Sequence, residues 1–488
     1  YSLTKKPCFS EVVLQSSQAK ITLMKLNFQN TFARLPQSFF EKVEPTPVIQ
    51  PSIIAVNDGL AEELGIDPDF LRSDEGLAFL SGNSIPEGAE PLAMAYAGHQ
   101  FGGFSPQLGD GRAILMGEIG GKDIQLKGAG PTSFSRRGDG RSALGPVLRE
   151  YLVSEAMHAL GIPTTRALAA VMSGELVLRE QPEKGGILTR VASSHLRIGT
   201  AQYFAARDDT ESLKALVEYA IQRHNLQAST AFELFQDVIR KQAQLVAQWM
   251  GLGFIHGVMN TDNMSLSGET IDYGPCAFMD QFNPTQKFSY IDQNGRYAYS
   301  NQPGIAQWNL TRFAEALLPL FNEDQEKAVQ MAKGELEKFP NLFDEAHIKI
   351  FSNKIGLPQN HDPELIQALL DLMASQKTDF TLTFRSLSNG PDSFLLNFED
   401  KKPAQDWLAR WNVAGIPETS LMKVVNPAYI PRNHQIEKVI EAANQDNFAP
   451  FYELNKALRN PYNEQEGFEK LQQPPTPEEI VCNTFCGT

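Results

Sequence analysis

The sequence predicts an α+β fold in which a strand-rich N-terminal part precedes a largely helical remainder. Apolar strand candidates fall before residue 200, at 113–119, 123–127, 164–171 and 186–191. Amphipathic helical patterns dominate after that point and continue to residue 440. Because 488 residues exceed one ordinary hydrophobic core, more than one lobe is expected.

Composition and charge restrict the class of protein. With 42% hydrophobic residues the chain can bury sizeable cores, and its formal net charge of −15 argues against a nucleic-acid-binding surface. No apolar run is long enough to predict a membrane span. Four cysteines in so long a chain do not make a disulfide framework. We therefore expect a cytoplasmic protein, or a mitochondrial one if the source is a eukaryote, with neither nucleic acid nor membrane as a partner.

Residues 1–23 are assigned to an N-terminal extension of undetermined origin. They lack the apolar core of a secretory signal, and their basic, acid-poor composition is weakly similar to that of a transit peptide. Met24 followed by Lys25 and Leu26 also makes a plausible natural start, so a reading frame extended upstream is the alternative.

Two glycine-rich loops flank the first pair of strands. Residues 96–112, YAGHQFGGFSPQLGDGR, run directly into strand 113–119, and the tetrapeptide GDGR recurs at 138–141 after strand 123–127. Glycine turns can present backbone N–H groups to a phosphate, and Arg112 and the strand-end Lys127 add positive charge. Ordinary hairpins and a solvated lysine are the alternatives, but the recurrence favours an anion site.

A helix is predicted over 146–160, because Pro146 stands near its start and Gly161 follows its end. Glu150 lies among its apolar positions, so this residue either faces solvent or pairs with a cation. Arg190, in strand 186–191, and Arg197 follow along the chain. Planar guanidinium groups suit phosphate oxygens, although surface ion pairing is the more common role of an arginine.

An amphipathic helix over 230–250 leads into the segment that carries most of the chemistry. Ser229 can cap its start, and Gly251 and Gly253 end it. The next residues, HGVMNTDNMSLSGETIDYG at 256–274, include Asp262, Asn263 and Asp272. Their oxygen atoms suit Mg²⁺ or Mn²⁺ that carries phosphates. Isolated Asp and Asn residues in such a stretch are also typical of turns.

This layout resembles the catalytic loop and the DFG segment of protein kinases. If His256 is aligned with the histidine of the kinase HRD triplet, Asn263 falls on the metal-binding asparagine and Asp272 on the DFG aspartate. Val258 then occupies the position of the catalytic aspartate, so the usual base is missing and Asp262 is the nearest replacement. The order of a strand lysine, Lys127, and a helix glutamate also fits. An inactive, kinase-shaped protein is the competing interpretation.

The rest of the chain is predicted to be helical, with helices over 208–224, 308–320 and 364–375 among them. Residues 426–433, NPAYIPRN, form a proline-fixed turn that either buttresses the site or joins two helices. Residues 471–479 are rich in Pro, Gln and Glu, which is typical of a flexible linker. Cys482 and Cys486 follow; zinc binding is disfavoured because no second pair exists, while reversible oxidation suits exposed thiols.

Four blocks together resemble the selenoprotein O (YdiU) family: YAGHQFGGFSPQLGDGR, QLKGAGPTSFSRRGDGR, HGVMNTDNMSLSGETIDYGPCAF and NPAYIPRN. The resemblance extends from about Met24 to the C-terminus and implies a protein-kinase-like bilobal fold, that of a pseudokinase, with a helical C-terminal extension. The expected division is an N-lobe at 24–205, a C-lobe with the catalytic loop and DYG at 206–335, a helical extension at 336–470 and a flexible tail with the cysteine pair at 471–488. The implied activity is adenylylation, in which AMP moves from ATP to Ser, Thr or Tyr hydroxyls of target proteins and pyrophosphate is released.

The family pattern also implies roles for individual residues. Asp262 is the implied proton acceptor, Asn263 and Asp272 are the implied ligands of Mg²⁺ or Mn²⁺, and Glu150 supports Lys127. In such members ATP sits reversed, with the γ-phosphate deep among Lys and Arg. The implied ATP-binding positions are Gly109, Gly111, Arg112, Lys127, Asp139, Gly140, Arg190, Arg197 and Asp272.

The resemblance further implies a redox-active tail. Cys486 stands where some relatives carry selenocysteine, and Cys276 is the obvious disulfide partner for a tail cysteine, either Cys482 or Cys486. Expected partners are ATP and protein substrates, with redox-related proteins among them. Three alternatives to adenylylation stay open: UMP transfer with Mn²⁺, conventional phosphoryl transfer, and nucleotide binding without catalysis.

Overall fold

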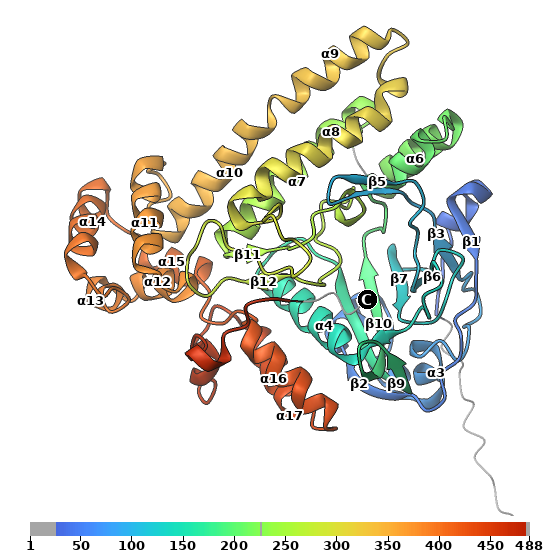
Figure 1. The fold of residues 1–488 in the computed structure, drawn as a ribbon, viewed down its shortest axis with the longest axis horizontal. Coiled ribbons are helices and arrows are strands. Elements are labelled where there is room, and N and C mark those ends of the chain that lie inside the picture. The colour runs from blue at the N-terminus through green and yellow to red at the C-terminus, as the bar shows by residue number, and fades with distance from the viewer. Residues whose placement is uncertain (1–25, 225–226, 485–488) are drawn as a thin grey trace, which may run out of the picture.

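An antiparallel sheet forms the centre of the N-terminal half of the computed structural model, which describes residues 26–224 and 227–484. The strands are β1 Phe40–Lys42, β2 Ser52–Val56, β3 Leu92–Met94, β6 Ala113–Ile119, β7 Lys122–Lys127, β8 Ser142–Ala143, β9 Arg166–Leu178 and β10 Pro182–Ala192. They lie in the order β1-β3-β6-β7-β10-β9-β2, and β8 pairs with β10. Their arrangement beside the helical part is visible in Figure 1.

Strands β6 and β7 form a tight hairpin that places one predicted loop beside a predicted lysine. All seven residues of β6 are buried. Gly120 and Gly121 join the strands with φ of +59° and +75°, values that residues without a Cβ adopt easily in a two-residue turn. Since Ala113 pairs with Lys127, Arg112 and Lys127 lie at the same end of the hairpin.

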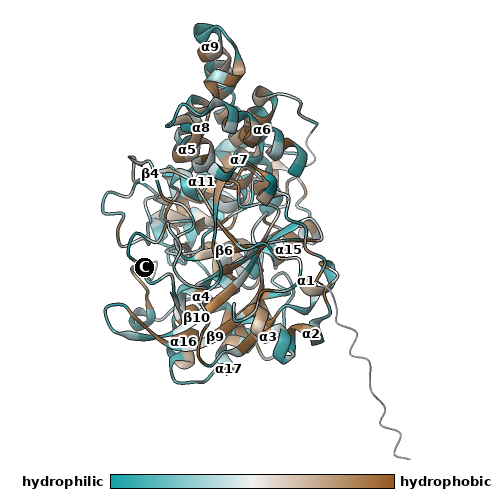
Figure 2. Ribbon diagram, turned by 90° about the vertical axis from the view of Figure 1, so that its right-hand side faces the viewer, coloured by the Kyte–Doolittle hydropathy of each residue, from teal (hydrophilic) through white to brown (hydrophobic). Residues whose placement is uncertain are grey.

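Helices cover both faces of the sheet because successive side chains of a strand point to opposite sides. Ile114, Leu126 and Ile187 pack in one hydrophobic cluster with α1 (Asp58–Glu63) and α3 (Asp74–Leu80); α2 (Pro68–Arg72) joins the same cluster. Leu115 and Leu188 face the opposite side, where α4 (Leu144–Ala159) packs. The apolar colouring of β9, β10 and neighbouring elements in Figure 2 follows this burial.

The second part of the molecule is built on long helices around a non-helical segment. Its helices are α5 Ile198–Ala205, α6 Thr210–Arg223, α7 Ala231–Gly251 and α8 Gln302–Phe321. Between α7 and α8, the short strands β11 (Phe254–Ile255) and β12 (Ala277–Phe278) pair antiparallel and enclose residues 256–276. The predicted catalytic segment is therefore a loop closed by a two-stranded ladder.

The C-terminal part is entirely helical in its regular structure. It contains α9 Gln325–Leu336, α10 Phe339–Lys354, α11 Pro363–Gln376, α12 Phe380–Leu387, α13 Pro391–Leu395, α14 Lys401–Ala414, α15 Thr419–Val425, α16 Asn433–Asn444 and α17 Ala449–Leu458. Helix α10 packs along α7, whereas α16 and α17 return to α4. The Tyr151 and Phe451 rings lie 5.5 Å apart, and Tyr462 Oη donates to Leu160 O at 2.9 Å, so the C-terminal helices support the helix that carries Glu150.

Several element boundaries differ from those that the sequence predicts. Strand β9 continues to Leu178, beyond the predicted 164–171, because it pairs with β10 along its length. Helix α7 is capped by Thr230 and not by Ser229: Thr230 Oγ1 accepts from Glu233 N, while Ser229 Oγ donates to Glu233 Oε2. Residues 98–105, predicted as irregular loop, contain a hairpin.

Residues 471–479, whose composition predicts a flexible linker, lie against α16. Gln435 Nε2 donates to Leu471 O at 2.8 Å, and Arg432 Nε donates to Gln472 O at 3.2 Å. Lys438 Nζ and Glu479 Oε1 form an ion pair at 2.5 Å. Contacts with side chains of α16 thus fix a segment that its composition predicts to be flexible. Over the ranges described above, no helix is both long and apolar enough to cross a membrane.

Candidate active site

Five charged side chains gather where α4, β7 and β10 meet the loop between β11 and β12. Lys127 Nζ lies 2.6 Å from Glu150 Oε2 and 2.9 Å from Asp272 Oδ1. Lys127 is the last residue of β7, and Glu150 is a buried residue of α4. The ion pair between strand lysine and helix glutamate therefore exists in the structure, and Asp272 shares the same ammonium group.

Two arginines complete this charge cluster. Arg190 Nη2 lies 3.0 Å from Glu150 Oε1 and 2.7 Å from Asp272 Oδ1. Arg197, the N-cap residue of α5, places Nη1 2.8 Å from Asp272 Oδ2. Both carboxylate oxygens of Asp272 are thus bound by cations, and three cations face two carboxylates.

Burial and ion pairing act in opposite directions on the two carboxyl groups. Burial alone would raise the pKa of Asp272, but Arg190, Lys127 and Arg197 hold it well below its usual range. Arg190 and Lys127 likewise lower the pKa of Glu150 against the effect of burial. The carboxyl groups of Asp272 and Glu150 are therefore both ionised at neutral pH, and both can form ion pairs with the cations of the cluster.

The arginines around Asp272 retain unused donors. Within the described part of the chain, no hydrogen-bond partner is found for the buried atoms Arg190 Nε and Nη1, Arg197 Nε and Arg112 Nη1. Leaving a buried donor unpaired costs about 1–3 kcal/mol per group. Such a set of unpaired donors is suited to an anion that supplies the missing acceptors.

The two GDGR loops pack tightly, but only one contributes to this region directly. Gly109 has φ of +71°, and a Cβ there would collide with the Phe134 ring; at Gly111 it would approach the Phe134 carbonyl oxygen at 3.0 Å. At Gly140, with φ of +67°, a Cβ would collide with the backbone of Gly130. Both loops thus lie against residues 130–135, and Arg112 links the first loop to Lys127.

Asp139 lies outside the charge cluster. Its carboxylate forms an ion pair with Arg179 Nη1 at 2.9 Å and accepts from the Arg141 backbone N–H at 2.9 Å. These contacts lower its pKa against the effect of partial burial. The structure therefore places the backbone of the second GDGR loop near the first loop, while the Asp139 side chain faces the end of β9.

His256 holds the segment that leads to Asp272. Its Nε2 donates to the Ile271 carbonyl oxygen at 2.9 Å, and its backbone N–H donates to Gln302 Oε1 at 3.0 Å. Burial lowers the pKa of His256, so the ring is neutral at pH 7. Asp272 itself adopts φ of +65°, an uncommon conformation for a residue other than glycine. His256 is therefore a structural residue that fixes the backbone before this strained aspartate.

Asp262 lies next to the charge cluster in the 3₁₀ turn Thr261–Asn263. Its backbone carbonyl accepts from Arg197 Nη1 at 2.8 Å. Burial raises the pKa of its carboxyl to about 6, although Arg197 acts in the opposite direction. A carboxyl with a pKa near neutrality is suited to accept a proton at physiological pH. Its buried Oδ1 has no hydrogen-bond partner among the described residues.

Asn263 and Asp272 fit a metal that is also bound by phosphate. Asn263 Nδ2 donates to the Val258 carbonyl oxygen at 3.0 Å, which leaves the amide oxygen as the ligating atom. Residues 26–224 and 227–484 contain no group of three or more His, Cys, Asp or Glu suited to a metal. Two oxygen ligands match Mg²⁺ or Mn²⁺ sites in which phosphate oxygens and water complete the coordination.

The structure describes two of the three cysteines that the sequence analysis singles out for redox chemistry. Cys276 is buried just after the DYG turn, Cys482 is exposed, and Cys486 lies outside the described residues. Thr484 Oγ1 donates to Pro275 O at 2.7 Å, and Thr484 N donates to Phe288 O at 2.8 Å. The tail therefore reaches the residue that precedes Cys276.

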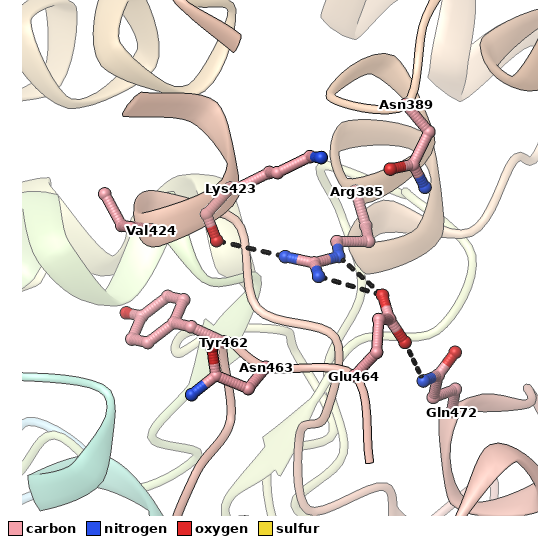
Figure 3. A pocket seen from close by; sticks show the side chains of 8 residues that line it. All are labelled: Arg385, Asn389, Lys423, Val424, Tyr462, Asn463, Glu464 and Gln472. Atoms are coloured by element: carbon pink, nitrogen blue, oxygen red, sulfur yellow. Dashed lines mark hydrogen bonds and ion pairs between the residues drawn. The ribbon is translucent and has the colours of Figure 1, made fainter. Parts of the chain in front are cut away.

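A separate pocket of about 530 Å³ lies in the helical C-terminal part and shares no residue with the charge cluster. Figure 3 shows its polar lining, in which Arg385 bonds to Glu464 and to the Lys423 carbonyl oxygen. Arg385 also donates to Asn426 O at 3.0 Å. Because these contacts occupy its guanidinium group, we interpret Arg385 as a structural residue that joins α12, α15 and the 464 region.

Sequence reasoning missed three residues that contact the site. Tyr96 stacks on Arg197, with the guanidinium carbon 4.6 Å from the ring centroid. Asp110 is buried behind Arg197, with Oδ1 3.8 Å from Arg197 Nη2. Gln100 contacts Asp262. All three lie in the conspicuous block 96–112, whose Phe-Gly-Gly-Phe turn could have indicated the hairpin at 98–105.

The fold and the charge cluster present an arrangement that suits a phosphate-bearing ligand together with a divalent metal. A family model described as "Protein adenylyltransferase SelO" matches residues 22–459. The chain is 54% identical to the protein nucleotidyltransferase YdiU of Bradyrhizobium diazoefficiens, an alignment that covers 94% of this chain and 99% of the relative. It is 55% identical to that of Methylorubrum populi, with the same coverage. The chain belongs to the SelO family.

Proposed function

We propose that this protein transfers AMP from ATP to Ser, Thr or Tyr hydroxyls of other proteins and releases pyrophosphate. The surplus of buried cationic donors around Asp272 carries the proposal, because a triphosphate supplies the acceptors that Arg112, Arg190 and Arg197 lack. The family description as an adenylyltransferase and the names of the relatives as protein nucleotidyltransferases support the same reaction class.

The fold is proposed to be protein-kinase-like and bilobal. The N-lobe spans 24–205, the C-lobe spans 206–335, the helical extension spans 336–470 and the tail spans 471–488. Support comes from the order of the charged residues: a strand lysine, a helix glutamate, and then two metal-ligand candidates in one loop between long helices.

ATP is proposed to bind with its β- and γ-phosphates among Lys127, Arg190 and Arg197. Glu150 and Asp272 neutralise only part of the positive charge of these three side chains. Phosphate oxygens of ATP therefore take the place of carboxylate oxygens as their partners. The remaining proposed contacts with the nucleotide are Gly109, Gly111, Arg112, Asp139 and Gly140. This orientation leaves the α-phosphate towards Asp262.

Asn263 and Asp272 would hold Mg²⁺ or Mn²⁺, which supplies charge neutralisation to the phosphates. Asp262 accepts the proton of the acceptor hydroxyl. The hydroxyl oxygen forms a bond to the α-phosphorus, and the bond between the α-phosphorus and the bridging oxygen breaks. Lys127 and the two arginines stabilise the pyrophosphate that leaves.

ATP labelled on either the α- or the γ-phosphate tests the reaction. Incubation with divalent metal should transfer α-label to protein, and intact-mass analysis should show a gain of one AMP. Transfer of the γ-label would establish a phosphotransferase. Nucleotide binding without any covalent product would establish an inactive pseudokinase. Faster transfer of UMP with Mn²⁺ would establish the uridylyl variant.

The tail is proposed to regulate the site through thiol oxidation. The hydrogen bond between Thr484 and Pro275, which directly precedes Cys276, supports a disulfide between Cys276 and a tail cysteine. Oxidant should change the activity of the wild type but not that of Cys486→Ser. Equal sensitivity of the two proteins would contradict this role.

The relatives named above are bacterial, and a cytoplasmic place of action with redox-related protein targets completes the proposal.

A further inference from the structure

A glycine-rich hairpin lies directly over Asp262. Strand β4 (Gly98–Gln100) pairs antiparallel with β5 (Gly103–Ser105), and within the described topology these two strands form a separate sheet. A Cβ at Gly98 would collide with Asp262 Oδ1. The hairpin therefore approaches the carboxylate so closely that position 98 must lack a side chain.

Backbone groups of the hairpin fasten it to the catalytic segment. His99 N donates to Thr261 Oγ1 at 2.7 Å, and Phe101 N donates to Asn260 Oδ1 at 3.0 Å. Thr261 Oγ1 in turn donates to Gln202 Oε1 at 2.6 Å. These bonds engage β4 and the turn that follows it, so β4 and residues 260–262 form one unit.

Gln100 is the side chain that this unit directs at the carboxylate. Its Nε2 donates to Asp262 Oδ2 at 3.3 Å. Among the described residues no other side chain donates to that carboxylate, since Arg197 bonds to the backbone carbonyl of Asp262 instead. Gln100 is neutral, so it can orient the group without neutralising it as an arginine would.

We propose that Gln100 is a positioning residue for Asp262. Its bond to Oδ2, together with the packing of Oδ1 against Gly98, fixes the rotation of the carboxylate, so that the group is held in one orientation for the acceptor hydroxyl. In the reaction, the hydroxyl O–H bond breaks and an O–H bond forms on the Asp262 carboxylate. The hydroxyl oxygen bonds to the α-phosphorus, and pyrophosphate leaves with the electron pair of the broken P–O bond. This inference rests on the proposed function.

The test combines two substitutions of Gln100 with a double-mutant cycle. Gln100→Met removes the donor at similar length, and Gln100→Glu keeps the shape but places a second carboxylate beside the first. Each is made in the wild type and in Asp262→Asn, and Ser105→Ala serves as a control on the same hairpin. The measurements are kcat for AMP transfer, the dissociation constant of ATP and the melting temperature.

We expect Gln100→Met to lower kcat about tenfold, or ~1.4 kcal/mol, with the ATP dissociation constant unchanged within about twofold. Gln100→Glu should lower kcat at least as much, and Ser105→Ala should behave as wild type. In Asp262→Asn neither Gln100 substitution should have a further effect, because Gln100 acts through Asp262. The absence of a further effect in Asp262→Asn distinguishes a positioning role from a merely structural contribution.

Wild-type kcat in both Gln100 variants would overturn the inference, as would equal losses in the two backgrounds. If both Gln100 variants bind ATP weakly, the residue supports the nucleotide site and the inference also fails. Full activity of Asp262→Asn would instead refute Asp262 as the proton acceptor, which is a failure of the proposed function and is distinguishable from the other outcomes.

Discussion

Two buried charge clusters of this molecule differ in how completely they are paired. Arg432, only 1% exposed, meets Asp280 and lies 2.8 Å from Asp379 Oδ2, while its Nε bonds to Gln472 O. One cation thus faces two carboxylates and a carbonyl oxygen. Around Asp272, in contrast, Lys127, Arg190 and Arg197 face Glu150 and Asp272, with Asp110 3.8 Å from Arg197, and buried guanidinium donors are still left without a partner among the described residues.

The difference separates a structural role from a binding role. The Arg432 cluster joins α16 to α12 and to the segment after β12, and every guanidinium nitrogen has a partner. Its pairing is complete, so it needs nothing from outside the protein. The cluster at Asp272 leaves guanidinium donors without a partner among the described residues, at a cost to the folded state. Such a cost is expected where a multiply charged ligand is bound.

The largest effect is expected for Lys127→Met. The substitution removes the cation shared by Glu150 and Asp272, so AMP transfer should fall on the order of 10²–10³-fold, by analogy with other lost electrostatic donors. Label transfer from ATP under saturating metal measures the loss. Lys214→Met, which changes an exposed lysine on α6, is the matched control. A loss below threefold, roughly 0.6 kcal/mol, would contradict the catalytic reading of the cluster.

Arg432→Met should lower stability while leaving activity close to wild type, in contrast to Lys127→Met, which should lower activity. Removing the cation leaves the half-buried Asp280 and Asp379 side by side without their partner, so the free energy of unfolding should fall by about 3 kcal/mol. Turnover per folded molecule should stay close to wild type. Denaturant unfolding and active-site titration measure the two quantities, with Arg240→Met, an exposed arginine of α7, as the control. Normal stability with reduced turnover would break the comparison.

Glu150→Gln should show an intermediate effect. One of the two carboxylates becomes neutral, so Lys127 and Arg190 lose part of their orientation but keep their charge. We expect about a tenfold fall in kcat, or ~1.4 kcal/mol, with ATP binding retained or strengthened. Steady-state kinetics and equilibrium ATP binding test this expectation together. Weaker ATP binding would show that Glu150 matters more for the shape of the site than for its charge.

The smallest effect concerns Lys354, a buried cation of α10 for which the structure shows no carboxylate partner among the described residues. Burial lowers its pKa to about 7, while its ammonium group lies 4.4 Å from the Phe384 ring centroid. The unfolded chain keeps the proton up to about pH 10. Wild-type stability should therefore rise as pH increases from about 7 to about 10, the range in which only the unfolded state binds the proton.

Lys354→Met should be more stable than the wild type, with the largest difference at about pH 6 and a smaller one at about pH 9. Melting temperatures at both pH values test the sign of the effect. A variant that is less stable at both values would show that contacts with the aromatic rings outweigh the cost of burial.

The central elements of this fold were predictable because each carries its own signal. Strands β6 and β7 and helices α4 and α7 follow from apolar periodicity and glycine punctuation within short windows. The pairing of Lys127 with Glu150 was implied by the resemblance to the protein-kinase layout, which the order of a strand lysine and a helix glutamate fits. The elements depend on residues that are neighbours in the chain, and the ion pair depends on a single contact between two elements.

What only the tertiary structure decided lies between distant segments. The pairing of Asp139 with Arg179, the clasp of Arg432 on Asp280 and the approach of Gln100 to Asp262 join residues that no local pattern relates. Periodicity reports which face of an element is buried, but not which partner covers it. By itself, therefore, the sequence determined the elements and the types of charge; the packing of those elements decided which distant charged groups meet and which guanidinium donors have no partner among the described residues.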